Sequence, residues 1–179
     1  MKLGLISLGC AKNRIDSELF LGVAKQYNIE LTSSLSDADI IVINTCGFIE
    51  SAKQEAIDTI LEVCDYKNKK IVVMGCLVER YQNSLEESIP EVDFYFPIRD
   101  YDNIDELFKK LTSSSLSYKM DYTKRVVTTS PHSVYLRIAE GCDNKCAYCA
   151  IPLIRGKFKS RDFDSLIEEA KVLVSNEAK

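Results

Sequence analysis

Short apolar runs alternate with stretches of helical periodicity along the first 111 residues of the chain. Strands are predicted at residues 2–8, 40–43, 71–74 and 92–96, with a weaker one at 28–32. Helices are predicted at residues 13–27, 51–64, 78–88 and 103–111, where apolar side chains recur at helical spacing. Because two of the strands are apolar throughout, they are typical of parallel strands that are covered on both faces. The alternation therefore predicts an α/β fold with a mostly parallel sheet.

The pattern changes after residue 111. The next twenty or so residues are rich in serine and threonine, so we expect a solvated linker with some extended structure. A strand predicted at residues 133–138 leads into a cysteine-rich loop, and a helix is expected at residues 165–175 with Asp164 as its N-cap. The predicted organisation is a domain at residues 1–111, a linker at 112–131 and the start of a second domain at 132–179.

Composition and charge exclude several classes of protein. Of the 179 residues, 46% are hydrophobic and 28% are charged, which is ordinary for a globular protein with a packed core. The net charge of -4 argues against bulk electrostatic binding of nucleic acid. No apolar run reaches the length of a membrane helix, and the first residues do not have the pattern of a signal peptide. Seven cysteines are too few for a disulfide scaffold, so we expect a cytoplasmic metalloprotein.

Three of the cysteines, Cys142, Cys146 and Cys149, lie within eight residues in the spacing C-x3-C-x2-C. A strand that ends in a short loop would direct their sulfurs into one small volume, which favours a soft metal. Structural zinc takes four ligands, so three thiolates better suit a [4Fe–4S] cluster with one iron left open for another molecule. Disulfides would leave one cysteine over and strain the loop. Zinc would need a fourth ligand, and the only histidine, His132, lies ten residues upstream of Cys142.

A second set of cysteines shares one kind of position. Cys10, Cys46 and Cys76 each follow a predicted strand and precede a predicted helix. In a parallel sheet such residues gather along the carboxyl edge, and a glycine beside each would let the backbone approach a bulky ligand. One such cysteine alone is most simply a small buried hydrophobe, but three at equivalent positions predict a shared metal site. Cys64 lies on the apolar face of a predicted helix, and we assign it to the core.

These segments resemble the methylthiotransferase family of radical S-adenosylmethionine (SAM) enzymes over nearly all of the chain. The similar segments are residues 7–13 (SLGCAKN), 44–49 (NTCGFI), 75–77 (GCL), 140–142 (EGC), the C-x3-C-x-aromatic-C loop, and residues 151–152, 155–156 and 160–161 after it. Within the family, the branch that modifies a small-subunit ribosomal protein is the more similar. For the branch that modifies tRNA, we would expect Gln-Met-Asn after the first cysteine and Ser-Val-Arg after the second.

The resemblance implies two [4Fe–4S] clusters. Cys142, Cys146 and Cys149 match the ligands of the cluster that binds SAM, and Tyr148 matches the aromatic residue beside its adenine. The residues that match the ligands of an auxiliary cluster are Cys10, Cys46 and Cys76. The implied reaction adds a methylthio group to the β-carbon of an aspartate in the twelfth protein of the small ribosomal subunit. SAM cleavage provides the radical that removes hydrogen, the auxiliary cluster carries or supplies sulfur, and a second SAM provides the methyl group.

The family continues into a complete SAM barrel and a further small β-barrel. A complete (β/α)8 barrel takes about 200 residues or more, so we expect an N-terminal fragment that is inactive alone. Two alternatives stay open: a tRNA adenosine methylthiotransferase, and a non-catalytic domain that binds zinc or an iron–sulfur cluster. The sequence names neither an electron donor nor an immediate sulfur donor.

Overall fold

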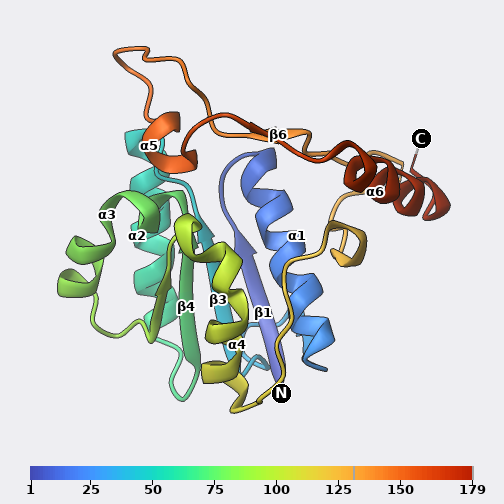
Figure 1. Cartoon of the computed structure of the whole chain (residues 1–179). Helices are drawn as coiled ribbons and strands as arrows, with labels where there is room; N and C mark the ends of the chain where they lie inside the picture. Colours follow the sequence, from blue (N-terminus) through green and yellow to red (C-terminus); the bar gives the residue numbers. More distant parts are fainter. Residues whose placement is uncertain (131, 179) are drawn as a thin grey trace.

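Five parallel strands form the central sheet of the computed structural model, which describes residues 1–130 and 132–178 (Figure 1). The strands are β1 (Lys2–Ser7), β2 (Glu30–Thr32), β3 (Ile40–Thr45), β4 (Lys70–Gly75) and β5 (Phe94–Phe96). They lie in the order β2-β1-β3-β4-β5, and every neighbouring pair is parallel. In this order the direction of winding reverses between β1 and β3, where doubly wound sheets bind their ligands at the carboxyl ends of the strands. The predicted α/β fold with a parallel sheet is confirmed.

Helices cover both faces of this sheet. They are α1 (Ala11–Gln26), α2 (Glu50–Cys64), α3 (Cys76–Ser88) and α4 (Ile104–Thr112), with a 3-10 turn η1 (Ile98–Asn103) before α4. Side chains of α1 and α4 share one apolar cluster with one face of the sheet, whereas α2 and α3 share a second cluster with the other face. All six residues of β3 are buried between the two layers, as its continuous apolar run predicts. In the described part of the chain, no helix has the length and apolar character needed to cross a membrane.

The register of the sheet places the ends of three strands at one level. Ser7 at the end of β1 pairs with Asn44 of β3, and Asn44 pairs with Met74 of β4. Since β1, β3 and β4 are adjacent, the loops that leave them begin side by side at the carboxyl edge. Any side chains carried by these loops are therefore close neighbours.

The segment predicted as a solvated linker packs against the first domain. Tyr118, Met120 and Val126 are partly buried against the cluster under α1 and α4, and the hydroxyl of Tyr27 donates to the carbonyl of Leu116 at 2.8 Å. The short turn η2 (Tyr122–Lys124) lies within this segment. These apolar side chains are scattered among serines and threonines, so the composition of the segment did not predict that they pack against the first domain. Pro131, the last residue of the predicted linker, lies outside the described residues.

The strand predicted at residues 133–138 does not form. Instead, β6 (Ala139–Glu140) pairs antiparallel with β7 (Lys159–Ser160), and the helices α5 (Ile151–Arg155) and α6 (Phe163–Ser175) follow the cysteine loop. Two carbonyls of the expected strand accept from arginine side chains rather than from a strand: Arg125 donates to Tyr135 and Arg161 donates to Arg137. The cap of α6 also differs, since Asp162 and not Asp164 accepts from the backbone N–H of Ser165.

Candidate metal centre

Three cysteines from the ends of three adjacent strands line one pocket of about 430 Å³. Cys10 follows β1 and precedes α1, Cys46 follows β3, and Cys76 begins α3 directly after β4. Cys76 is buried, Cys46 is half-buried and Cys10 is exposed. The structure thus brings together the trio that the sequence places at the carboxyl edge of the sheet.

Two glycines let these loops approach so closely. Gly9 has a φ of +101°, and a Cβ on it would lie 2.9 Å from the Cβ of Cys46. A Cβ on Gly47 would lie 2.8 Å from the Cα of Leu77 and 2.9 Å from the carbonyl oxygen of Cys76. Contacts this short are not available to a real side chain, so the two positions require glycine. Close approach of the loops at Gly9 and Gly47 is therefore what lets the three cysteines line one pocket.

Asn13 forms the polar floor of the pocket and is fully buried. Its Oδ1 lies 3.5 Å from the Sγ atoms of both Cys10 and Cys76. Its Nδ2 donates to the carbonyl of Thr45 at 2.8 Å, and Asn44 donates back to the carbonyl of Asn13 at 2.7 Å. These bonds lock the Asn13 side chain between β3 and α1, because a buried amide needs its partners.

A buried ion-pair network holds Arg155, which lines the pocket, and Asp16 lies at the centre of the network with no exposed surface. Its two carboxylate oxygens accept from Arg137 at 2.6 Å and from Arg155 at 2.7 Å. Glu140 lies 3.3 Å from Arg137, 3.6 Å from Arg155 and 2.9 Å from Lys12. Asp16 and Lys12 belong to α1, whereas the other three residues follow the linker. The network therefore holds the second segment over the carboxyl edge of the sheet.

Arg155 also reaches the cysteines. Its Nη2 lies 3.5 Å from the Sγ of Cys76 and 3.2 Å from the Oδ1 of Asn13. Burial raises the pKa of the Cys76 thiol, and the nearby positive charge of Arg155 and its hydrogen bond oppose that rise. Arg155 is thus the cation that favours a thiolate at the buried cysteine.

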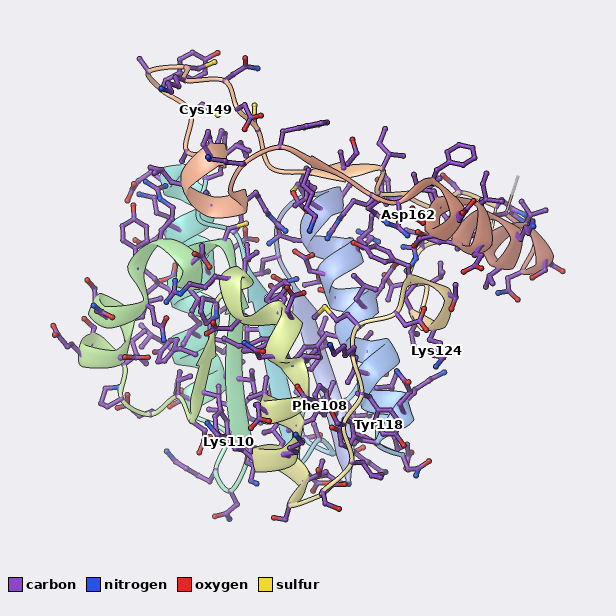
Figure 2. All side chains as sticks on the ribbon, viewed as in Figure 1. Phe108, Lys110, Tyr118, Lys124, Cys149 and Asp162 are labelled. Atoms are coloured by element: carbon purple, nitrogen blue, oxygen red, sulfur yellow. The ribbon has the colours of Figure 1, made fainter. Side chains whose placement is uncertain are left out.

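The second trio lies on an exposed loop outside this pocket. Figure 2 shows Cys149 on the loop above α5, away from the sheet. The loop contains one tight turn, in which the backbone N–H of Cys149 donates to the carbonyl of Cys146 at 3.1 Å. Cys142 and Cys149 are half-buried, Cys146 is exposed, and Tyr148 is 89% exposed. Their role as ligands stays a prediction.

Within residues 1–130 and 132–178, no group of three or more Cys, His, Asp or Glu side chains is arranged to hold a single metal ion. A [4Fe–4S] cluster makes a different demand, because each cysteine binds a different iron and the sulfurs stand further apart. The strand-end pocket suits such a group. It has three thiols, walls that include Phe48, Ile49 and Ile154, and one cation beside the buried thiol.

Several residues of the site were missed as contributors by sequence reasoning. Lys12, Asn13 and Arg155 lie inside segments that resemble the methylthiotransferase family, but the resemblance assigns no role to these three residues. Asp16 and Arg137 lie outside those segments. Their contribution to the site is seen only in the structure, where they pair although they are 121 positions apart in the sequence. Cys64, assigned to the core, is half-buried and packs beside the cluster under α2 and α3.

Comparison with known proteins adds independent information. The model of the uncharacterized protein family UPF0004 matches residues 2–97, which include Cys10, Cys46 and Cys76. Among curated proteins, a ribosomal protein uS12 methylthiotransferase RimO from Clostridium tetani is 49% identical over 190 aligned positions. The alignment covers 100% of this chain and 43% of that relative.

Relatives of the same name come from other bacteria. The one from a Sulfurihydrogenibium species is 48% identical, with 98% of this chain and 40% of the relative covered. The one from Campylobacter fetus is also 48% identical, with 97% of this chain and 41% of the relative covered. The chain thus spans about two fifths of the length of the curated relatives it matches.

Proposed function

The chain belongs to the uncharacterized protein family UPF0004. From that premise we propose that it is the N-terminal part of a radical SAM methylthiotransferase. The proposed reaction adds a methylthio group to the β-carbon of an aspartate in ribosomal protein uS12. The observation that carries the proposal is the convergence of Cys10, Cys46 and Cys76 on one pocket. Similarity to uS12 methylthiotransferases over the whole chain supports the choice of substrate.

The proposed cofactors are two [4Fe–4S] clusters and SAM. Cys10, Cys46 and Cys76 would hold one cluster, and Cys142, Cys146 and Cys149 would hold the other. Tyr148 is proposed to lie beside the adenine of SAM. When bound, this set supplies the reductive cleavage that activates an otherwise inert carbon–hydrogen bond, together with the sulfur and the methyl group.

The chain's own residues prepare the strand-end pocket. Gly9 and Gly47 let the loops approach, so that three thiols face one volume. Buried Ile154 and the partly exposed side chains of Phe48 and Ile49 give it an apolar lining. Asn13, held by Thr45 and Asn44, fixes the floor. Positioning is what a protein contributes when a cofactor does the difficult chemistry.

The proposed organisation follows from the same segments. Residues 1–111 would form the auxiliary-cluster domain, residues 112–131 a connection and residues 132–179 the start of the SAM-binding domain. A uS12 substrate would place the protein in the cytoplasm with the ribosome. We propose no membrane partner and no direct nucleic-acid partner for this part of the protein.

The decisive experiment uses the complete protein in a bacterium that lacks its own uS12 methylthiotransferase. The mass of uS12 should rise by one methylthio group at a single aspartate, and tRNA nucleosides should be unchanged. A methylthio group on tRNA adenosine instead would support the tRNA alternative. An ultraviolet–visible spectrum of anaerobically reconstituted chain tests the non-catalytic zinc alternative, since iron–sulfur proteins are brown and zinc proteins are colourless.

A further inference from the structure

We propose that Arg155 is a positioning residue for the cluster in the strand-end pocket, acting through its hydrogen bond to the Sγ of Cys76. A residue of the second segment would then set the reduction potential of a site that the first segment builds. The inference rests on the proposed function, because it takes the pocket to hold a [4Fe–4S] cluster.

The position of Arg155 is fixed from several sides. Its side chain is 2% exposed, and its Nη1 lies 2.7 Å from a carboxylate oxygen of Asp16. Its Nη2 is 3.2 Å from the Oδ1 of Asn13 and 3.5 Å from the Sγ of Cys76. A planar guanidinium held by Asp16 on one nitrogen can aim the other nitrogen only in a narrow range of directions. The Nη2 of Arg155 is therefore held in place to donate to the Sγ of Cys76.

The charges around Arg155 favour an anion at Cys76. Among residues 1–130 and 132–178, the three cations Lys12, Arg137 and Arg155 form ion pairs with two carboxylates, those of Asp16 and Glu140. A buried thiolate is costly unless a hydrogen bond or a cation compensates it. These ion pairs leave one positive charge uncompensated, and a thiolate at Cys76, which lies beside Arg155, would compensate it.

A donor at this place should affect electron uptake. Hydrogen bonds to the sulfurs and the net charge nearby are among the factors that set the potential of an iron–sulfur cluster. A fixed positive charge stabilises the reduced form, which carries one more electron, so it raises the potential. Removing the guanidinium should therefore make the cluster harder to reduce.

Arg137 provides a matched control. It binds the same Asp16 at 2.6 Å and also pairs with Glu140 at 3.3 Å, so its removal disturbs the same ion-pair network. Arg137 donates to carbonyl and carboxylate oxygens, and it does not line the pocket. A general disturbance of the network should follow from changing either arginine, whereas an effect through sulfur should follow from changing Arg155 alone.

The experiment measures the midpoint potential of a single cluster. Cys142, Cys146 and Cys149 are all replaced by alanine, so that only the strand-end pocket can be loaded. Arg155→Gln, Arg155→Lys and Arg137→Gln are then made in this background. Each protein is reconstituted anaerobically with iron and sulfide, and iron per chain, circular dichroism and the midpoint potential are measured. The expected result is a more negative potential for Arg155→Gln, a smaller shift for Arg155→Lys and the parent value for Arg137→Gln.

The other outcomes are equally decisive. Equal shifts in Arg155→Gln and Arg137→Gln, or no shift in Arg155→Gln, would overturn the inference. If Arg155→Gln holds no iron while the other two variants are loaded, the inference stands, because charge beside the sulfur is then what the cluster requires. Loss of iron from all three assigns the effect to the ion-pair network and refutes it. If the parent itself binds no cluster, the proposed function fails first, and the inference falls with it.

Discussion

Replacing Asp16 with asparagine tests whether the buried ion pairs hold the two segments together. The change is nearly isosteric, so packing is preserved while the negative charge is lost. Asp16 has no exposed surface and binds Arg137 at 2.6 Å and Arg155 at 2.7 Å. In the variant, both guanidinium groups stay buried, and Glu140 becomes the carboxylate that they share.

The magnitude follows from what remains. Removing one partner of a buried ion pair typically costs about 3–5 kcal/mol, because the other charge is left uncompensated. Glu140 still lies 3.3 Å from Arg137 and 3.6 Å from Arg155, and asparagine keeps one oxygen acceptor. We therefore expect the lower end, about 3 kcal/mol of unfolding free energy. For a protein of this size, that corresponds to a fall of about 6–12 °C in Tm.

The assay is urea unfolding at neutral pH, followed by circular dichroism and by tyrosine fluorescence, since the chain has no tryptophan. Glu50→Gln is the control, because Glu50 is 87% exposed and its ion pair with Lys53 is screened by solvent, so its loss should change the unfolding free energy little. Adding Arg137→Gln to Asp16→Asn should recover part of the loss, since it removes one uncompensated cation. If Asp16→Asn lowers the unfolding free energy by less than about 1 kcal/mol, the reasoning is refuted, because removing one partner of a buried ion pair should cost more.

Four further predictions concern the pocket and its surroundings. Cys10→Ala should remove about half of the roughly eight irons per reconstituted chain, while Cys64→Ala should remove none; full iron content in Cys10→Ala would exclude it as a ligand. Gly47→Ala should destabilise the fold by about 1–3 kcal/mol and lower iron loading, because its Cβ would meet the backbone of Leu77; calorimetry and iron analysis check both. Burial alone would raise the pKa of Glu140, but Lys12, Arg155 and Arg137 lower it below its ordinary value of 4.5. Its stabilising contribution is therefore present above pH 4.5 and is lost as the pH falls through the folded-state pKa, so Glu140→Gln should show a shallower loss of unfolding free energy below pH 4.5. Finally, the 179-residue chain with SAM and a reductant should not modify uS12, since it spans only about two fifths of its relatives; a mass increase on uS12 would contradict this.

Local patterns in the sequence determined the first domain. Continuous apolar runs predicted β3 and β4, and helical spacing predicted α1 and α2 to within a few residues, because burial on one or two faces leaves a direct imprint on the sequence. The gathering of Cys10, Cys46 and Cys76 was also predictable. It depends only on parallel strands that share one carboxyl edge, and the strand order β1-β3-β4 then makes them neighbours.

The second segment was predicted less well, and the reason is also physical. The strand predicted at residues 133–138 was wrong, and the carbonyls of Tyr135 and Arg137 accept from arginine side chains instead of from a neighbouring strand. The cap predicted at Asp164 was also wrong, because Asp162 is the N-cap of the helix. A strand forms only beside a partner strand, and the periodicity of the sequence does not show whether a partner strand lies next to it. The linker stays a prediction as a connection between domains, and most of its residues are exposed or only partly buried. The sequence did not show that single side chains within it, such as Tyr118, pack against the first domain.

Only the tertiary structure decided how the two segments meet. Asp16 and Arg137 are 121 positions apart, and neither has a periodic or compositional signal that would connect them. The hydrogen bond from Arg155 to Cys76 joins residues 79 positions apart. Local sequence fixes which residues form a strand or a helix, because those choices depend on near neighbours and on burial. Pairing between distant charges depends on how whole elements are placed, so the fold had to be known before the cation beside Cys76 could be identified.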